Sequence, residues 1–374
     1  MKISLFMAEE NYENPKTEEI FLPFSKEKME GELGKDFMDV LKMVAPGTSL
    51  RVALDDFLNA KMGALIVLDN GNLGDIVEGG FKVNTKFSAQ KLVELAKMDG
   101  AIILSKDVKE ILNVNTLLFP SISISTKETG TRHKAAERTA KQAKTIVIAV
   151  SERKNKISLY YGDSSYQLER SSEILRRASE TLQILEKQRD VFDNLLLNLN
   201  SLELRRHATI TDVCMVLQRV EIMKRVSEVV ERYLIELGKE GTIVKMRLKE
   251  LMGGLQKEEE SILKDYFGQN HSSSLEILEK MDFDFLLEPM NISRLLFEEL
   301  HDKTISPRGV RLLGKTNLLE RYIDLLIGNF ENLSEILSAS NEELLEILGS
   351  EAMLSFFREE VYNLKEKVNL GKGL

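Results

Sequence analysis

At 374 residues the chain is long enough for two or three domains, because a domain usually takes roughly 100–200 residues. Its 43% hydrophobic and 30% charged residues exclude disorder, and the absence of an apolar run of ~18 residues excludes membrane spans and secretion. One cysteine and four scattered histidines exclude a disulfide framework and a zinc site rich in Cys or His, which favours a cytoplasmic protein. The net charge of −9 excludes a generally basic nucleic-acid-coating protein, so any DNA contact must be local.

The first part of the chain, to about residue 164, alternates short apolar runs with helical patterns. Runs rich in β-branched residues and bounded by turn formers predict strands over 63–68, 100–104, 145–150 and 157–161. Between them, Ser88 is a candidate cap for a helix that runs through Met98, and Thr131 begins another that runs through Lys144. These elements predict a compact α/β domain.

The middle of the chain reads as uninterrupted helix, because no glycine or proline lies between Gly162 and Gly238. Apolar residues with heptad spacing predict one long helix from Leu168 to Leu199 and a second over 211–237, with Gly238 as its C-cap; shorter helices follow to about residue 300. We interpret the region as a helical spacer or an oligomerisation spine, since no residue supports a ligand site inside it. The apolar stripes either meet within one chain as an antiparallel bundle or contact other subunits.

The last part, from Ser306, predicts a small all-α module of amphipathic helices. Loops are expected at Gly328-Asn and Gly349-Ser, and Ser340 is the expected cap of the helix that begins at Asn341.

The densest polar cluster of the first part is Thr129-Gly-Thr-Arg-His-Lys-Ala-Ala-Glu-Arg138, which opens a helix directly after a loop. A helix start offers free N–H groups and a positive dipole end, and Arg132, His133 and Lys134 add cationic or proton-donating groups beside it. Cations in a first turn oppose the helix dipole unless an anion binds there. The cluster therefore favours a polyphosphate site over an ordinary solvated helix start.

A second feature is Asp99-Gly-Ala101, where a carboxylate ends a helix before the next strand. Such an acid can hold Mg²⁺ or Mn²⁺ against phosphate oxygens, and the glycine lets the chain approach a ligand closely. Alone, Asp-Gly is more often a simple turn. Its weight as a metal site comes only from its combination with the cationic cluster.

Together these motifs resemble the diadenylate cyclase domain, and their order before a helical region resembles the DNA integrity scanning protein (DisA) family. The resemblance extends from about residue 38 to 345. The segments that carry it are Gly63-Ala-Leu-Ile66, Gly79-Gly-Phe-Lys-Val83, Phe87-Ser88, Met98-Asp-Gly-Ala-Ile102, Glu128-Thr-Gly-Thr-Arg-His133 and Ile157-Ser-Leu-Tyr-Tyr161. The paired Asp-Gly-Ala and Thr-Arg-His motifs are its specific part.

The resemblance implies a role for each residue at a motif position. Asp99 would hold the metal and help to activate the ribose 3′-hydroxyl, and Arg132 and His133 would complete the catalytic set. The implied nucleotide-binding residues are Gly100, Ala101, Leu118, Thr131, Arg132, His133, Lys134, Ala135 and Ser151. One departure is Lys134, where the family usually has arginine; lysine keeps the charge but loses the bidentate fork, so phosphate binding is expected to survive in weaker form.

A larger departure lies at the C-terminus, where family members carry a helix-hairpin-helix module with a Gly-Ile-Gly hairpin that offers amides to DNA phosphates. Here the hairpin position reads Ile347-Leu-Gly-Ser-Glu-Ala-Met353, so the second glycine is missing and Glu351 stands near the phosphate position. From residue 301 on, twelve acidic residues face nine basic ones. A module with weakened DNA contact and one that still binds DNA both stay open.

We therefore predict an α+β multidomain chain. It would consist of an N-terminal extension of unknown role (1–35), an α/β diadenylate cyclase domain with a central mixed sheet (36–164), an all-α helical spine (165–300) and a helix-hairpin-helix-like module with a degenerate hairpin (301–374). The implied activity is that of a nucleotidyltransferase dependent on Mg²⁺ or Mn²⁺, which condenses two ATP into cyclic di-3′,5′-adenylate and two pyrophosphates and is coupled to DNA integrity sensing. The alternative is a DNA-junction-binding or structural signalling protein with weak or lost cyclase activity.

Assembly follows from the symmetry of the implied product. Each ATP must present its 3′-hydroxyl to the α-phosphorus of the other, yet the chain has one Asp-Gly-Ala and one Thr-Arg-His motif. The second ATP must then come from another subunit, with the two sites face to face. We expect a homo-oligomer with an even number of chains, and the family resemblance implies an octamer.

Overall fold

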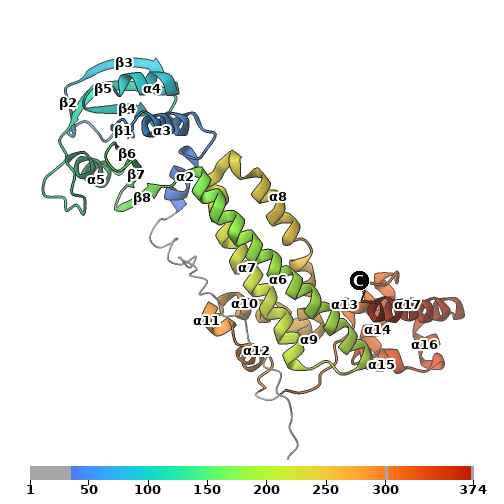
Figure 1. The fold of residues 1–374 in the computed structure, drawn as a ribbon. Coiled ribbons are helices and arrows are strands. Elements are labelled where there is room, and N and C mark those ends of the chain that lie inside the picture. The colour runs from blue at the N-terminus through green and yellow to red at the C-terminus, as the bar shows by residue number, and fades with distance from the viewer. Residues whose placement is uncertain (1–34, 300–301, 372–374) are drawn as a thin grey trace, which may run out of the picture. The chain divides into compact units, whose positions relative to one another are not determined.

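The computed structural model describes residues 35–299 and 302–371, so the predicted N-terminal extension lies almost entirely outside the described residues (Figure 1). The described residues form two compact units. Unit 1 takes residues 35–44 and 53–168, and unit 2 takes residues 45–52, 169–299 and 302–371. Unit 1 contains a sheet with helices and unit 2 is helical, which confirms the predicted α+β multidomain class.

A mixed eight-stranded sheet forms the centre of unit 1. Its strands are β1 (Ala64–Asp69), β2 (Val77–Glu78), β3 (Phe81–Lys86), β4 (Ala101–Ser105), β5 (Glu110–Leu118), β6 (Ile146–Ser151), β7 (Lys156–Tyr161) and β8 (Ser164–Leu168). The order is β2-β5-β4-β1-β6-β7-β8, with β3 also paired to β5. Only β1 and β4 are parallel; the other named pairs are antiparallel. The central strands β1, β4 and β6 are continuous apolar runs, as expected for strands covered on both faces.

The helices of unit 1 include α2 (Lys35–Met43), α4 (Ala89–Leu95) and α5 (Thr131–Ala143), and α3 (Ser49–Asn59) begins in the short segment assigned to unit 2. Ser88 caps α4 as predicted, because its side chain accepts from the Lys91 N–H; the predicted run through Met98 is wrong, because α4 ends at Leu95 and turns follow. Helix α5 buries the small side chains of Ala136, Ala140 and Ala143 in a cluster with residues of β1, β4, β6 and β7. Small side chains let a helix lie close to a sheet. The packing of this face therefore fixes the position of α5 on the sheet, and with it the position of its first turn.

Two long helices, α6 (Ser171–Arg205) and α7 (Ile210–Leu237), form the spine of unit 2 (Figure 1). They run side by side, joined by a short loop, and their buried apolar residues lie in one core cluster. This confirms the two long helices and the alternative in which their stripes meet within one chain. The predicted start at Leu168 is wrong, because Ser164–Leu168 pair with β7 as strand β8 and α6 begins only at Ser171. Thr209 and Asp212 form a capping box at the start of α7, and Gly238 is its C-cap as predicted.

Shorter helices complete unit 2. They are α8 (Thr242–Leu251), α9 (Leu255–Phe267), α10 (His271–Lys280), α11 (Phe283–Leu286), α12 (Pro289–Leu296), α13 (Val310–Leu313), α14 (Glu320–Asn329), α15 (Leu333–Ser338), α16 (Asn341–Leu348) and α17 (Glu351–Asn369), with 3₁₀ turns at Gly238–Gly241 and Gly268–Asn270. The capping box at Ser340 and the break at Gly349 match the sequence predictions. The loop predicted at Gly328-Asn is wrong, because α14 continues to Asn329. Among the helices of residues 35–299 and 302–371, none combines the length and the apolar character needed to cross a membrane.

A buried ionic network joins the last helices to the spine within unit 2. The Asp265 carboxylate on α9 accepts from the backbone N–H groups of Gly309, Val310 and Arg311, at 2.8, 2.6 and 3.0 Å. Arg311 is buried, and its guanidinium pairs with Glu203 on α6 and with Glu258 on α9. Because the charges are buried and paired, the start of α13 is fixed to both α6 and α9.

Candidate active site

The predicted site residues gather at one edge of the sheet of unit 1. Parallel β1 and β4 begin at this edge, with Ile66 opposite Ile102, and antiparallel β6 ends there, with Val150 opposite Ala64. Two residues before the pair of Ile66 and Ile102, the same register places Gly100 opposite Ala64. Asp99 is exposed in the loop that leads from α4 into β4. The carboxylate therefore lies at the edge where β1 begins and β6 ends.

Gly100 fixes the path of the chain directly after Asp99. Its φ is +92°, in the region that favours glycine, and a Cβ there would lie 2.8 Å from the Thr116 carbonyl oxygen and 2.9 Å from the Asn115 carbonyl carbon. These backbone atoms belong to β5, whose register against β4 shifts at this point. Because backbone cannot swing away, a side chain at position 100 would move β4 or β5 and Asp99 with them.

The start of α5 reaches the same edge through the Arg132 side chain. Gly130 is the N-cap residue of α5, and no side chain caps the helix, so its first N–H groups remain available to an anion. Thr131 and Arg132 are exposed, and Lys134 is half-buried one position beyond His133. One guanidinium nitrogen of Arg132 lies 3.5 Å from the carbonyl oxygen of Val150, which it faces as a donor. Arg132 thus reaches the end of β6.

His133 is half-buried beside a tyrosine and a glutamate. Its ring meets that of Tyr160 edge to face, with centroids 6.5 Å apart, and the Tyr160 hydroxyl donates to Glu128 Oε1 at 2.7 Å. Burial lowers the pKa of His133 below its ordinary 6.5; the charge of Glu128 opposes this effect, and Arg132 adds to it. Burial and Glu128 raise the pKa of Tyr160. At neutral pH the site therefore combines a neutral imidazole with a tyrosine that stays protonated.

The loop that precedes α5 is fastened to α5 itself. The Glu137 carboxylate accepts from the Thr126 hydroxyl and, at 3.2 Å, from the Lys127 N–H, and it pairs with Lys141 at 2.8 Å. Arg138 donates from Nε to the carbonyl of Ile124 at 2.9 Å. Side chains of α5 thus hold the loop that leads to the start of the helix. This fixes the backbone conformation directly before the basic first turn.

The remaining predicted binding residues lie around this edge in different settings. Leu118 ends β5 and is half-buried, and Ala135 is half-buried on α5. The side chain of Ala101 is fully buried, so it belongs to the core. Ser151 ends β6, where its hydroxyl accepts from the Lys154 N–H at 3.3 Å in the turn to β7. Geometry alone gives Ser151 a structural role in that turn.

A divalent metal fits the site only if the substrate brings oxygen ligands. Among the described residues, no group of three His, Cys, Asp or Glu side chains lies together to enclose an ion. Mg²⁺ is often held by one or two carboxylates, with waters and phosphate oxygens completing the shell. Exposed Asp99, near a cationic helix start, matches that ligand set.

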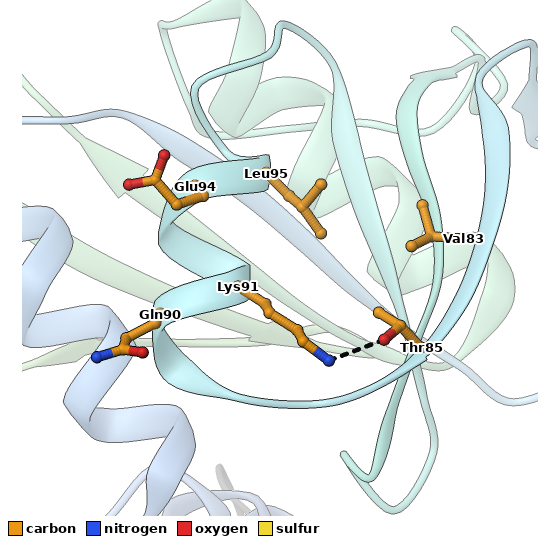
Figure 2. Close-up of a pocket in the computed structure, with 6 residues that line it drawn as sticks. All are labelled: Val83, Thr85, Gln90, Lys91, Glu94 and Leu95. Carbon is orange, nitrogen blue, oxygen red and sulfur yellow. Dashed lines mark hydrogen bonds between the residues drawn. The ribbon is translucent and has the colours of Figure 1, made fainter.

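A shallow cavity of about 430 Å³ lies elsewhere in unit 1, between β3 and α4. Figure 2 shows its lining residues, Val83, Thr85, Gln90, Lys91, Glu94 and Leu95, and the hydrogen bond of 2.9 Å from Lys91 to Thr85. None of these residues was predicted for the site. The chemically useful groups lie at the sheet edge and not in this cavity.

Sequence reasoning assigned no role to several residues that shape the site. Glu128 and Tyr160 stand inside the quoted motifs, and Glu137 stands inside the polar cluster, yet only the fold shows what they contact. For Glu137 the sequence signal is an acid within a cationic segment. Gly63 also stands in a quoted motif, directly before β1.

Comparison with known protein families places both units. Residues 51–165 match the family described as DisA bacterial checkpoint controller nucleotide-binding, and residues 168–301 match the DisA bacterial checkpoint controller linker region. The fold and this match define a protein with a nucleotide-binding domain of the diadenylate cyclase class followed by a helical linker.

Similar proteins agree over most of the chain. The DNA integrity scanning protein DisA of Clostridioides difficile is 43% identical over 348 residues, which cover 90% of this chain and 98% of that protein. The protein of the same name from Acetivibrio thermocellus is 44% identical over 84% of this chain and 90% of its own. The crystal structure of a double mutant of DacA from Staphylococcus aureus is similar to 34% of this chain and covers 86% of its own, with 24% identity and a TM-score of 0.28. The chain belongs to the DNA integrity scanning protein DisA family.

Proposed function

We propose that this protein condenses two ATP molecules into cyclic di-3′,5′-adenylate with release of two pyrophosphates. The observation that carries the proposal is the convergence of one exposed carboxylate, Asp99, with the uncapped, basic start of α5 at one sheet edge. The membership in the DisA family and the match to its nucleotide-binding domain support ATP as the substrate.

The reaction needs two displacements at phosphorus. In each, the 3′-hydroxyl oxygen of one ATP forms a bond to the α-phosphorus of the other, the bond from that phosphorus to pyrophosphate breaks, and the hydroxyl proton is released. In this proposal Asp99 orients the hydroxyl and receives its proton. With Asp99 as its protein ligand, Mg²⁺ or Mn²⁺ would offset the negative charge of the phosphates.

Arg132, His133 and Lys134 act on the polyphosphate in this proposal. The guanidinium and the free N–H groups of α5 stabilise the charge that develops on the leaving pyrophosphate. His133, neutral at pH 7, donates a hydrogen bond from one ring nitrogen. The loop contacts of Glu137 hold these groups in place before substrate arrives, so less order is lost on binding.

The second ATP comes from a second subunit, because one chain supplies one set of these groups. Two sites that face each other about a two-fold axis let each ATP attack the other. We therefore infer an even-numbered homo-oligomer.

A role in sensing DNA has less support from the C-terminal helices. The Ser350 side chain accepts from the Met353 N–H at 3.2 Å, so an amide in the first turn of α17 is already satisfied within the chain. Glu351, the first residue of α17, adds a negative charge to that turn. We propose that this surface binds DNA phosphates weakly.

The decisive experiment incubates purified protein with ATP and either Mg²⁺ or Mn²⁺ and identifies the products by mass. The expected products are cyclic di-adenylate and two pyrophosphates per cyclic molecule. A protein that binds ATP but forms no cyclic product with either metal would contradict the proposed activity.

A further inference from the structure

The Arg132 guanidinium occupies the space that a side chain at position 63, directly before β1, would fill. A Cβ built on Gly63 would lie 2.1 Å from Arg132 Nη1, 2.9 Å from Cζ and 3.2 Å from Nη2. Real Cβ atoms essentially never approach another heavy atom within 3.0 Å. The φ of Gly63 is not positive, so the missing side chain, rather than an unusual backbone conformation, is what this place requires.

The opposite strand completes the place where the guanidinium lies. Arg132 Nη1 faces the carbonyl oxygen of Val150 at 3.5 Å, and Val150 is paired with Ala64, the residue after Gly63. The guanidinium therefore lies between the start of β1 and the end of β6. An exposed arginine on a helix usually samples many rotamers. This contact pair restricts Arg132 to the sheet edge next to the Asp99 loop.

We propose that Gly63 is a positioning residue for Arg132: by lacking a Cβ, it lets the guanidinium rest against the sheet edge in one orientation toward the triphosphate. This inference rests on the proposed function, in which Arg132 acts on the phosphates. A planar guanidinium binds phosphate oxygens through two parallel N–H groups, so its orientation matters as much as its charge. Its placement before substrate binds lowers the entropy lost on binding.

If Gly63 were needed only for the fold, Gly63→Ala would lower the stability of the protein. The positioning role leads to the opposite expectation. The atoms that a Cβ would meet are at the far end of a flexible side chain, so the arginine can swing away without disturbing the fold. Gly63→Ala should therefore preserve stability and lose function. Gly74→Ala is the matched control, because a Cβ at Gly74 meets nothing within 4 Å and its φ is not positive.

The test is a double-mutant cycle of Gly63→Ala and Arg132→Ala, with initial rates of cyclic product formation, ATP affinity and the thermal midpoint of unfolding measured for each variant. We expect Gly63→Ala to lower kcat/KM at least ten-fold and to weaken ATP binding, with a midpoint within about 2 °C of the unaltered protein. Gly74→Ala should match the unaltered protein. In the Arg132→Ala background, Gly63→Ala should cost no further activity or affinity.

Three results would overturn the positioning role: full activity and ATP affinity in Gly63→Ala, an equal loss in both backgrounds, or a Gly63→Ala protein that does not fold. Arg132→Lys is an independent check of oriented guanidinium binding, because lysine keeps the charge but lacks the atoms that lie over Gly63. It should lose kcat/KM by a factor close to that of Arg132→Ala; full activity would count against oriented guanidinium binding. A fully active Arg132→Ala protein would instead contradict the proposed phosphate role of Arg132, which distinguishes the two failures.

Discussion

Asp99 and the glycine after it form one functional unit at the scale of single residues. Gly100 passes so close to the backbone of Asn115 and Thr116 that no side chain fits, and this contact fixes where the Asp99 loop leaves the sheet. The carboxylate itself is exposed. Its chemistry can therefore be removed without opening the core.

Asp99→Asn should keep the fold and lose most turnover. The amide keeps the shape of the side chain but neither binds a metal strongly nor accepts a proton, which should raise the barrier by several kcal/mol, or about 10²-fold or more in rate. Initial rates of cyclic product formation, with circular dichroism as a folding check, measure this. Asp75→Asn, at an exposed position of the same unit, is the control. Near-normal rates in Asp99→Asn would remove this carboxylate from the mechanism.

The charge state of His133 depends on the Glu128 carboxylate. Burial lowers the pKa of His133 and the negative charge of Glu128 raises it, so Glu128→Gln should lower this pKa further. The imidazole would then gain its proton only at a more acidic pH. Nuclear magnetic resonance titration can follow this among four histidines, with the His133→Gln protein to assign the signal. An unchanged or higher pKa in Glu128→Gln would contradict the electrostatic description of this pair.

At the scale of elements, the loop before α5 and α5 itself behave as one piece. Glu137, Arg138 and Lys141 on the helix contact backbone or side chains of residues 124–127, and the Tyr160 hydroxyl holds Glu128. The loop has little regular structure of its own. Its conformation is therefore set by side chains of the helix that follows it.

Glu137→Gln should weaken nucleotide binding without removing any group from the site edge. The amide accepts fewer hydrogen bonds than the carboxylate and loses the pair with Lys141, so we expect a loss of about 1–3 kcal/mol in unfolding free energy and a weaker ATP affinity. Glu94→Gln, whose pair with Lys97 is exposed, is the control and should change neither quantity by more than a few tenths of a kcal/mol. ATP affinity equal to that of the unaltered protein would show that the loop needs no anchor there.

The turn between α16 and α17 should make a poor DNA site. With one amide satisfied by Ser350 and Glu351 in the first turn, binding to duplex or branched DNA should be weak and fall steeply with added salt. Fluorescence anisotropy with a branched oligonucleotide at several salt concentrations measures this. Glu351→Lys should strengthen binding at low salt, and Glu346→Lys on α16 tests whether charge alone is enough. Submicromolar binding by the unaltered protein at physiological salt would refute this expectation.

Sequence patterns predicted some elements better than others, for physical reasons. Strands β1, β4 and β6 match the predictions because each is dominated by an unbroken apolar run, and β7 matches because its apolar and aromatic residues are bounded by turn formers. Strand β5 was missed because its register shift places Asn115 at a φ of +53°, which interrupts the alternation that marks a strand. Gly328 predicts a loop, but burial of Leu326 on α14 outweighs the weak helix propensity of one glycine.

The candidate site likewise contains residues that the sequence identifies and contacts that only the structure shows. Motif residues at the sheet edge were identified from the sequence and its resemblance to a family, and the structure brings the Asp99 loop and Arg132 to the same edge of the sheet. The contact of Gly63 with Arg132 could not be predicted, because it joins residues that are distant in sequence and depends on how closely α5 lies on the sheet. The contacts of Glu137 could not be predicted either, because they go to a loop that has no regular pattern.

At the scale of the whole molecule, activity should depend on association between chains. If each site supplies one ATP, the specific activity should fall on dilution once subunits separate, while the fold of each chain persists. Activity measured over a wide range of protein concentration, together with mass by light scattering, tests this. A monomer that forms the cyclic dinucleotide at undiminished specific activity would refute the face-to-face arrangement.

The ionic network around Arg311 has a consequence for how this chain can be divided. A chain cut near residue 300 would keep Glu203, Glu258 and Asp265 but lose Arg311 and the amides of α13, which removes the guanidinium and amide partners of these carboxylates. Such losses cost about 3–5 kcal/mol for one broken pair, a large part of the stability of an ordinary domain. The last helices are therefore not an independent module that can be removed or exchanged without loss of stability. A protein in which the C-terminal helices are exchanged has to preserve Arg311 or replace the acids that surround it.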